Sequence, residues 1–176
     1  MANLGLRKPT NKIVAAGSPL VQELNVETAT NMYPGRLVIK GTDDNDIAVC
    51  GAAGISVGWL GYEQCGNAAF MPTDVNTIYA EGDQAPVLYG GKFVIVGKLT
   101  TSQTIVKGDR LVAGADGTVQ KAAAEGLAEG STPVTSTAAT GVVTGSIGAG
   151  GIVVGIAMES VTTTDAVADI MVLSLI

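Results

Sequence analysis

Glycine punctuates this chain along its whole length and separates short runs of β-forming residues. The 176 residues include 24 glycines, about twice the usual share of about 7%. Val and Thr are frequent between them, and segments rich in both Glu and Lys are scarce. Glycine permits tight turns, whereas β-branched residues favour strands. The pattern therefore predicts an all-β fold of roughly eight to eleven short strands, closed as a small β-barrel or a β-sandwich.

The length suits one domain, which should bury roughly 70% of the surface that its unfolded chain exposes. We expect residues 1–20 to form an extended N-terminal arm and residues 21–176 to form a single β-rich domain. The stretch at about 122–151 is low in complexity and rich in small residues and Thr, so we expect a long exposed loop there.

Strands are expected where apolar residues alternate with polar ones or run between turn residues. They are expected within 20–26, 33–41, 47–50, 54–62, 76–83, 92–99 and 169–176. Within 92–99, Phe93, Ile95 and Leu99 share one face, and Val94 and Val96 make the other face apolar as well. A strand with two apolar faces is either central to the fold or covered by a second subunit.

The segments 82–91 and 108–117 resemble each other: both open with Gly-Asp and both end on Gly. We interpret each as the start of a hairpin, so that Tyr89-Gly90-Gly91-Lys92 is a two-residue hairpin turn. The Gly91-Lys92 pair also raises the alternative of a phosphate-binding loop. Such a loop would need Gly at 86 and Ser or Thr at 93, followed by a helix. The chain has Pro86, Phe93 and a strand pattern instead.

Catalytic and metal-binding motifs are scarce. The chain has no His, which excludes Ser-His-Asp and Cys-His arrangements. The cluster Asp43-Asp44-Asn45-Asp46 lacks the Gly and Glu spacing of a calcium loop, so a surface turn is expected. Cys50 and Cys65 are expected to be reduced. We therefore predict no catalytic, cofactor or metal site and no enzyme. A carboxylate pair acting on carbohydrate remains an alternative, because counting acids cannot exclude it.

The charge is unevenly distributed. Residues 1–22 carry Arg7, Lys8 and Lys12 and no acid, which makes +3 and leaves −9 for the rest of a chain of net charge −6. A basic arm on an acidic body fits contact with another protein better than a nucleic-acid surface. A solvated terminus without a partner is the alternative. The uncharged stretch 130–158 is too rich in Gly, Ser and Thr to predict a membrane span, so we expect a soluble protein.

Several segments resemble the decoration, or cement, proteins of tailed phages and head-tailed viruses. They are "NMYPGRLV" (31–38), "VGWLGYEQ" (57–64), "YAEGDQAPVLYGGKFVI" (79–95), "KGDRLVAGADGTVQKA" (107–122) and "VVGIAMESVTTTDAVADIMVL" (153–173). The resemblance covers most of the chain after residue 30. It rests on turns and strands and carries no motif of functional residues.

The resemblance implies a structural virion protein that binds the outside of an assembled capsid and bridges major capsid protein subunits, commonly as a homotrimer. It implies localisation on the capsid surface, and in the host cytoplasm during assembly, with no nucleic-acid or membrane partner. The candidate capsid contacts lie in the arm: Leu4, Leu6, Arg7, Lys8, Lys12 and Ile13. Deletion of residues 1–18 is expected to spare the fold and weaken attachment. Another virion component, such as a head fibre or tail-tube protein, is the alternative, and a carbohydrate-binding module is a further one.

Overall fold

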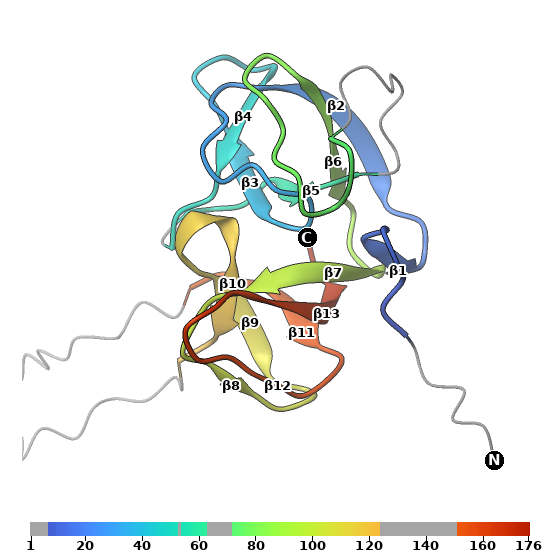
Figure 1. The fold of residues 1–176 in the computed structure, drawn as a ribbon, viewed down its shortest axis with the longest axis vertical. Coiled ribbons are helices and arrows are strands. Elements are labelled where there is room, and N and C mark those ends of the chain that lie inside the picture. The colour runs from blue at the N-terminus through green and yellow to red at the C-terminus, as the bar shows by residue number, and fades with distance from the viewer. Residues whose placement is uncertain (1–6, 53, 63–71, 124–150) are drawn as a thin grey trace, which may run out of the picture.

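The computed structural model describes residues 7–52, 54–62, 72–123 and 151–176, whose regular secondary structure is almost entirely β-strand. Two small barrels are stacked one on the other (Figure 1). Within the described residues the single helical element is a 3₁₀ turn, Ala115–Gly117. No helix in that part of the chain is long and apolar enough to cross a membrane. The prediction of an all-β, barrel-forming chain is confirmed.

The first barrel closes five strands from the N-terminal half of the chain. They are β2 (Leu20–Val26), β3 (Leu37–Lys40), β4 (Asp46–Val49), β5 (Gly58–Leu60) and β6 (Gln84–Tyr89). Their order around the ring is β2-β4-β3-β5-β6, and the antiparallel pairing of β2 with β6 closes it. Closure leaves these five strands with a hydrogen-bonded neighbour on each side, which removes exposed sheet edges.

Aliphatic side chains and one tyrosine fill the first barrel. The buried set is Val26, Met32, Val38, Ile47, Leu60, Tyr79, Ala85 and Val87. Each large apolar side chain in such a core contributes about 1.5–3 kcal/mol relative to exposure. The Tyr79 hydroxyl donates a hydrogen bond to the Gly61 carbonyl oxygen at 3.1 Å, so the polar end of this buried ring is paired.

The second barrel is built from β7 (Val94–Leu99), β9 (Arg110–Ala113), β10 (Val119–Lys121), β11 (Val153–Ala157) and β13 (Ala168–Ser174). The order is β7-β10-β9-β11-β13, and the pairing of β13 with β7 closes the ring. A further strand, β1 (Val14–Ala16), adds to β7. The short strands β8 (Thr104–Ile105) and β12 (Val161–Thr162) form a separate pair.

One continuous core joins the two barrels. It packs Leu37, Trp59 and Leu88 of the first barrel against side chains of the second, Ile95 and Val172 among them. The fully buried Trp59 reaches across the junction, where its indole N–H donates to Ser174 Oγ at 3.1 Å. The barrels therefore share their largest apolar cluster. The expectation of a single domain over 21–176 stays a prediction, and most of the 122–151 stretch lies outside the described residues.

The Tyr89–Lys92 turn is a crossover between barrels, so its interpretation as a hairpin is wrong. β6 belongs to the first barrel and β7 to the second, and the two strands do not pair. Gly90, Gly91 and Lys92 all have positive φ, which swings the chain from one ring into the other. The C-terminus fixes this turn: the Gly91 amide donates to the Ile176 carbonyl oxygen at 2.8 Å and the Lys92 amide to that of Ser174 at 3.0 Å.

The repeated Gly-Asp is a repeated turn. The Asp83 carboxylate accepts a hydrogen bond from the Ala80 amide at 2.7 Å, and the Asp109 carboxylate accepts one from the Val106 amide at 2.8 Å. Both glycines have positive φ, and each turn leads into a barrel strand, β6 in the first and β9 in the second. The second copy does continue as a hairpin, β9–β10, as predicted.

Two expected strands are largely absent. Residues 76–83 form turns without a strand, and within 54–62 only β5 is extended. A regular strand over 54–62 would place Ile55, Val57 and Trp59 on one face. Ile55 is instead 71% exposed, whereas Trp59 is fully buried. The described residues contain thirteen strands, more than expected, because β1, β8 and β12 are too short to leave a recognisable pattern.

The second apolar face of β7 is covered within the chain. Val94 and Val96 pack with Met171 of β13, and Ala15 and Ala16 of β1 lie against the same cluster. A second subunit is therefore not needed to bury this face. The expected strand at the C-terminus is confirmed as β13, which lies between β7 and β11.

Candidate functional site

The N-terminal segment, defined here as residues 7–16, is attached to the second barrel and to the chain between β5 and β6. Lys8 Nζ forms an ion pair with Glu159 Oε1 at 2.8 Å and also donates to the Asp169 carbonyl oxygen at 2.5 Å. Asn11 Oδ1 accepts a hydrogen bond from the Val75 amide at 3.2 Å. The Ile13 carbonyl oxygen accepts one from the Val96 amide at 2.7 Å. This segment is therefore a fixed part of the barrel surface, and β1 is visible beside β7 in Figure 1.

The predicted arm contacts fall into three groups. Leu4 and Leu6 lie outside the described residues. Arg7, Lys8 and Lys12 are exposed, although Lys8 is held by its ion pair. Ile13 is only 2% exposed, because its side chain packs in the core shared by the two barrels. Ile13 therefore anchors the segment to its own chain, and the arm residues as capsid contacts stay a prediction.

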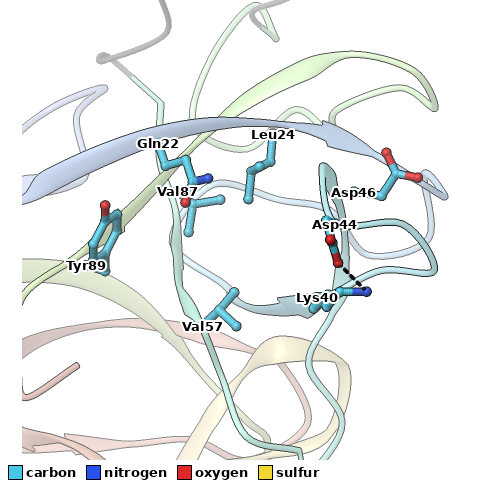
Figure 2. A pocket seen from close by; sticks show the side chains of 8 residues that line it. All are labelled: Gln22, Leu24, Lys40, Asp44, Asp46, Val57, Val87 and Tyr89. Carbon is cyan, nitrogen blue, oxygen red and sulfur yellow. Dashed lines mark ion pairs between the residues drawn. The ribbon is translucent and has the colours of Figure 1, made fainter.

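A pocket of about 290 Å³ opens at one end of the first barrel. Figure 2 shows the side chains of Leu24, Val57 and Val87 pointing into one space, with the Lys40–Asp44 ion pair at the rim. The full lining is Gln22, Leu24, Lys40, Asp44, Asp46, Val57, Val87 and Tyr89. It joins apolar walls to two carboxylates and one ammonium group, a combination that suits an apolar group next to a polar or cationic one.

Local sequence patterns do not reveal this barrel-end pocket. Its one local signal was the alternation in 20–26, which puts Gln22 and Leu24 on the same face of β2. The other lining residues come from β3, β4, β6 and the chain before β5, which ring closure brings together. The expected turn at 43–46 is confirmed: the Asp46 amide donates to the Asp43 carbonyl oxygen at 3.2 Å.

Two titratable groups with shifted pKa values, Cys50 and Asp109, have surroundings that fit a structural role. Cys50 is a free, buried thiol whose pKa is raised by desolvation, which disfavours the reactive thiolate, and Cys65 lies outside that part. The pKa of Asp109 is lowered by hydrogen bonds from Lys121 and from the Val106 amide. The described residues bring together no group of three His, Cys, Asp or Glu side chains suited to a metal ion.

Comparison with known proteins gives a family match and a likeness to solved structures. A family model described as the XM1 gp53 minor capsid protein matches residues 7–158, which include the first barrel and most of the second. The crystal structure of the head fiber gp8.5 N base of bacteriophage phi29 is similar, at 14% sequence identity and a TM-score of 0.47. That alignment covers 89% of this chain and 94% of the phi29 chain. Comparison with curated proteins finds no significant match.

Proposed function

This chain belongs to the XM1 gp53 minor capsid protein family, and we propose on that premise that it is a decoration protein of the capsid exterior. Membership makes it a capsid-associated virion protein of a phage, in agreement with the resemblance of its turns and strands. In the proposed role it binds the major capsid protein of an assembled shell and links neighbouring subunits. It resides on the capsid surface, and in the host cytoplasm during assembly.

The observation that supports this role most directly is the fixed N-terminal segment. Ile13 and β1 hold its end in the second barrel, while Arg7 and Lys12 stay exposed on an otherwise acidic chain. A capsid contact made by Leu4, Leu6 and Arg7 would therefore transmit force to the barrel core through the anchored segment. We propose these three residues and Lys12 as capsid contacts, with Ile13 as their anchor.

Linking subunits requires more than one contact per particle. We propose that the protein self-associates as a homotrimer, so that several N-terminal segments engage neighbouring capsid subunits together. Each contact can be weak, because linked contacts raise overall retention by effective concentration. We propose a mechanical, non-enzymatic role that requires no cofactor, nucleic acid or membrane.

Binding to preformed, expanded capsid shells tests this function. The full-length chain should co-sediment with shells, and the double variant Arg7→Glu/Lys12→Glu should bind about tenfold more weakly, because two favourable charge contacts become unfavourable. The matched control is Lys107→Glu/Arg110→Glu, which makes the same charge change at exposed positions of the second barrel. Equal binding of the two variants would remove the N-terminal segment from the interface.

Copy number separates the proposed role from that of a head fibre. A decoration protein that covers the shell should be present in numbers comparable to the capsid symmetry positions, whereas a fibre attached at a few positions would be present in far fewer copies. Quantitative mass spectrometry of purified virions measures this ratio. A copy number far below that of the shell positions would contradict a decoration role.

A further inference from the structure

The barrel-end pocket opens where the wall of the first barrel is incomplete. β4 pairs with β2 through the last two residues of β2, because β4 begins only at Asp46. The earlier residues of β2 pair with β6 on their other side and extend beyond that contact. Leu24 and Val87 therefore face Val57, from the chain before β5, across a space of about 290 Å³ (Figure 2).

The size and the walls of this pocket suit one apolar side chain. Small-molecule sites have volumes of about 300–1,000 Å³ and mostly apolar linings, so this pocket stands at the small end of that range. Val57 is 44% exposed and Leu24 is half-buried, so apolar surface in the pocket is left in contact with water. An apolar group that covers this surface gains the free energy of hydrophobic burial.

The rim of the pocket has no ammonium donor left for an anion. Lys40 is the one cation in the lining. Its Nζ forms an ion pair with Asp44 Oδ1 at 3.3 Å and donates to the carbonyl oxygens of Gly41 at 3.4 Å and Thr42 at 3.1 Å. An ammonium group has three N–H donors, so these three acceptors use all of them.

The carboxylates at the same end of the barrel keep acceptor capacity. The Asp44 side chain is 93% exposed, and no described residue donates a hydrogen bond to its Oδ2. Asp46 also lines the pocket, but Figure 2 shows its carboxylate turned away, so it acts through its charge alone. Glu27 lies beside the same turn, where its Oε1 accepts from the Thr42 amide at 3.2 Å. Residues 20–89 contain nine acidic and two basic residues, and this excess of negative charge attracts a cation.

We propose that the barrel-end pocket binds an apolar side chain whose neighbour is a lysine or arginine, in a segment of the capsid partner. The capsid as the source rests on the proposed function. The apolar side chain enters between Leu24, Val57 and Val87, and its basic neighbour stays at the rim beside Asp44. Entry of the basic side chain itself is disfavoured, because its charge would be placed against apolar walls. The contact gives the first barrel a part in attachment, in addition to the N-terminal segment on the second.

An alkylammonium ion carries the same two groups, so n-butylammonium is the probe and the full-length chain is the protein. The methyl NMR signals of Leu24, Val57 and Val87 report entry of the tail. n-Butylammonium should shift them saturably, with a dissociation constant of about 1 mM or weaker for so small a ligand. Methylammonium should bind at least about tenfold more weakly, because each buried CH₂ group strengthens binding about fourfold. No saturable shift with n-butylammonium would overturn the inference.

Pentanoate separates the charge from the tail. It carries the same butyl tail on an anion, so it should bind about fivefold more weakly than n-butylammonium at this acidic rim. Equal or tighter binding of pentanoate would overturn the selection of a basic neighbour.

Val57→Thr tests whether the probe enters this pocket. The substitution keeps the branched shape but makes one wall polar, so n-butylammonium should bind about threefold more weakly. Val21→Thr is the matched control, because Val21 is 42% exposed and does not line the pocket. Equal affinities of the two variants would place the probe elsewhere and overturn the inference.

Capsid shells test the occupant. Asp44→Lys reverses the rim charge, and the matched control Asp165→Lys makes the same change at an exposed position between β12 and β13. Asp44→Lys should attach to expanded shells about fivefold more weakly than Asp165→Lys. Equal attachment of the two variants would overturn the capsid segment as the occupant.

The outcomes separate the two proposals. Binding of n-butylammonium without any attachment of the full-length chain to shells contradicts the proposed function and leaves the pocket site standing. Attachment to shells without binding of n-butylammonium contradicts the site alone.

Discussion

Gly97 and Trp59 show how single positions hold the barrels together. A Cβ atom at Gly97 would lie 2.9 Å from Trp59 Cζ3, so glycine lets the indole ring approach β7 this closely. The indole N–H then reaches Ser174 on the neighbouring strand β13. Composition alone could not reveal this, because a glycine required by a ring from another barrel looks like any other glycine in the sequence.

Gly97→Ala should lower the free energy of unfolding by about 1–3 kcal/mol, because the ring must move within a packed core. Urea denaturation followed by Trp59 fluorescence measures the change. Gly51→Ala is the matched control, since a Cβ there meets no atom within 4 Å, and its stability should be nearly unchanged. Equal effects of the two substitutions would contradict the role given to Gly97.

Ser174→Ala tests the same junction through its hydrogen bond. The substitution leaves the buried Trp59 N–H without its acceptor, which should cost about 1–3 kcal/mol of unfolding free energy. Thermal unfolding by circular dichroism measures this. Unchanged stability in the variant would show that the hydrogen bond contributes nothing to the junction.

The Asp109 turn makes a pH-dependent contribution at the start of the β9–β10 hairpin. The pKa of the Asp109 carboxyl group is lowered from the ordinary value of 3.8, chiefly by the hydrogen bond from Lys121. A carboxylate whose pKa is lowered in the folded state stabilises the fold above about pH 4. That stabilisation is lost as the pH falls through the folded-state pKa. Lys121→Met should raise the pKa of Asp109 toward 3.8, as measured by carboxyl-carbon NMR titration. An unchanged pKa would contradict Lys121 as the main cause.

Because the N-terminal segment is anchored in the barrel core, truncation should affect the stability of the fold. Deletion of residues 1–16 removes Ile13 and β1 and should lower the unfolding free energy by about 2–5 kcal/mol for Ile13 alone. Deletion of residues 1–6 should leave the melting temperature nearly unchanged but weaken capsid attachment. This replaces the expectation that loss of 1–18 spares the fold. Equal melting temperatures of the two truncations would show that β1 is dispensable.

Local sequence patterns predict some elements correctly and others wrongly, because they do not contain the contacts between distant segments. The alternation in 20–26 predicts β2 with its bounds, although burial does not alternate along the strand: Leu20 to Glu23 are exposed and only Val26 is buried. The sequence predicts a hairpin at Tyr89–Lys92 where the structure has a crossover, because a glycine pair bends the chain equally well into either. Residues 76–83 carry strand-forming types, but Tyr79 is fixed by the barrel core and the backbone around it turns.

The architecture of two barrels depends on pairings between distant segments. β2 closes on β6 and β7 closes on β13, and no local pattern encodes either contact. The sequence could therefore predict a barrel but not two. The barrel-end pocket shares this origin, since its lining combines residues from several strands and loops. The charges of the N-terminal segment can be predicted from the sequence, whereas the burial of Ile13 is seen only in the folded structure.

The proposed homotrimer is testable in solution. Mass measurement of the purified full-length chain, of 17.7 kDa, should give three copies per particle, and dilution should reveal whether assembly precedes capsid binding. A monomer at all concentrations, with trimers absent on shells as well, would contradict self-association as the source of multivalent attachment.

We propose that this protein stabilises a capsid by linking its subunits, and the rupture temperature of shells measures that stabilisation. Expanded shells saturated with the full-length chain should rupture at a higher temperature than bare shells. Shells incubated with the chain lacking residues 1–6 should rupture close to the bare value. A full-length chain that binds shells without raising their rupture temperature, or that does not bind them, would contradict the account.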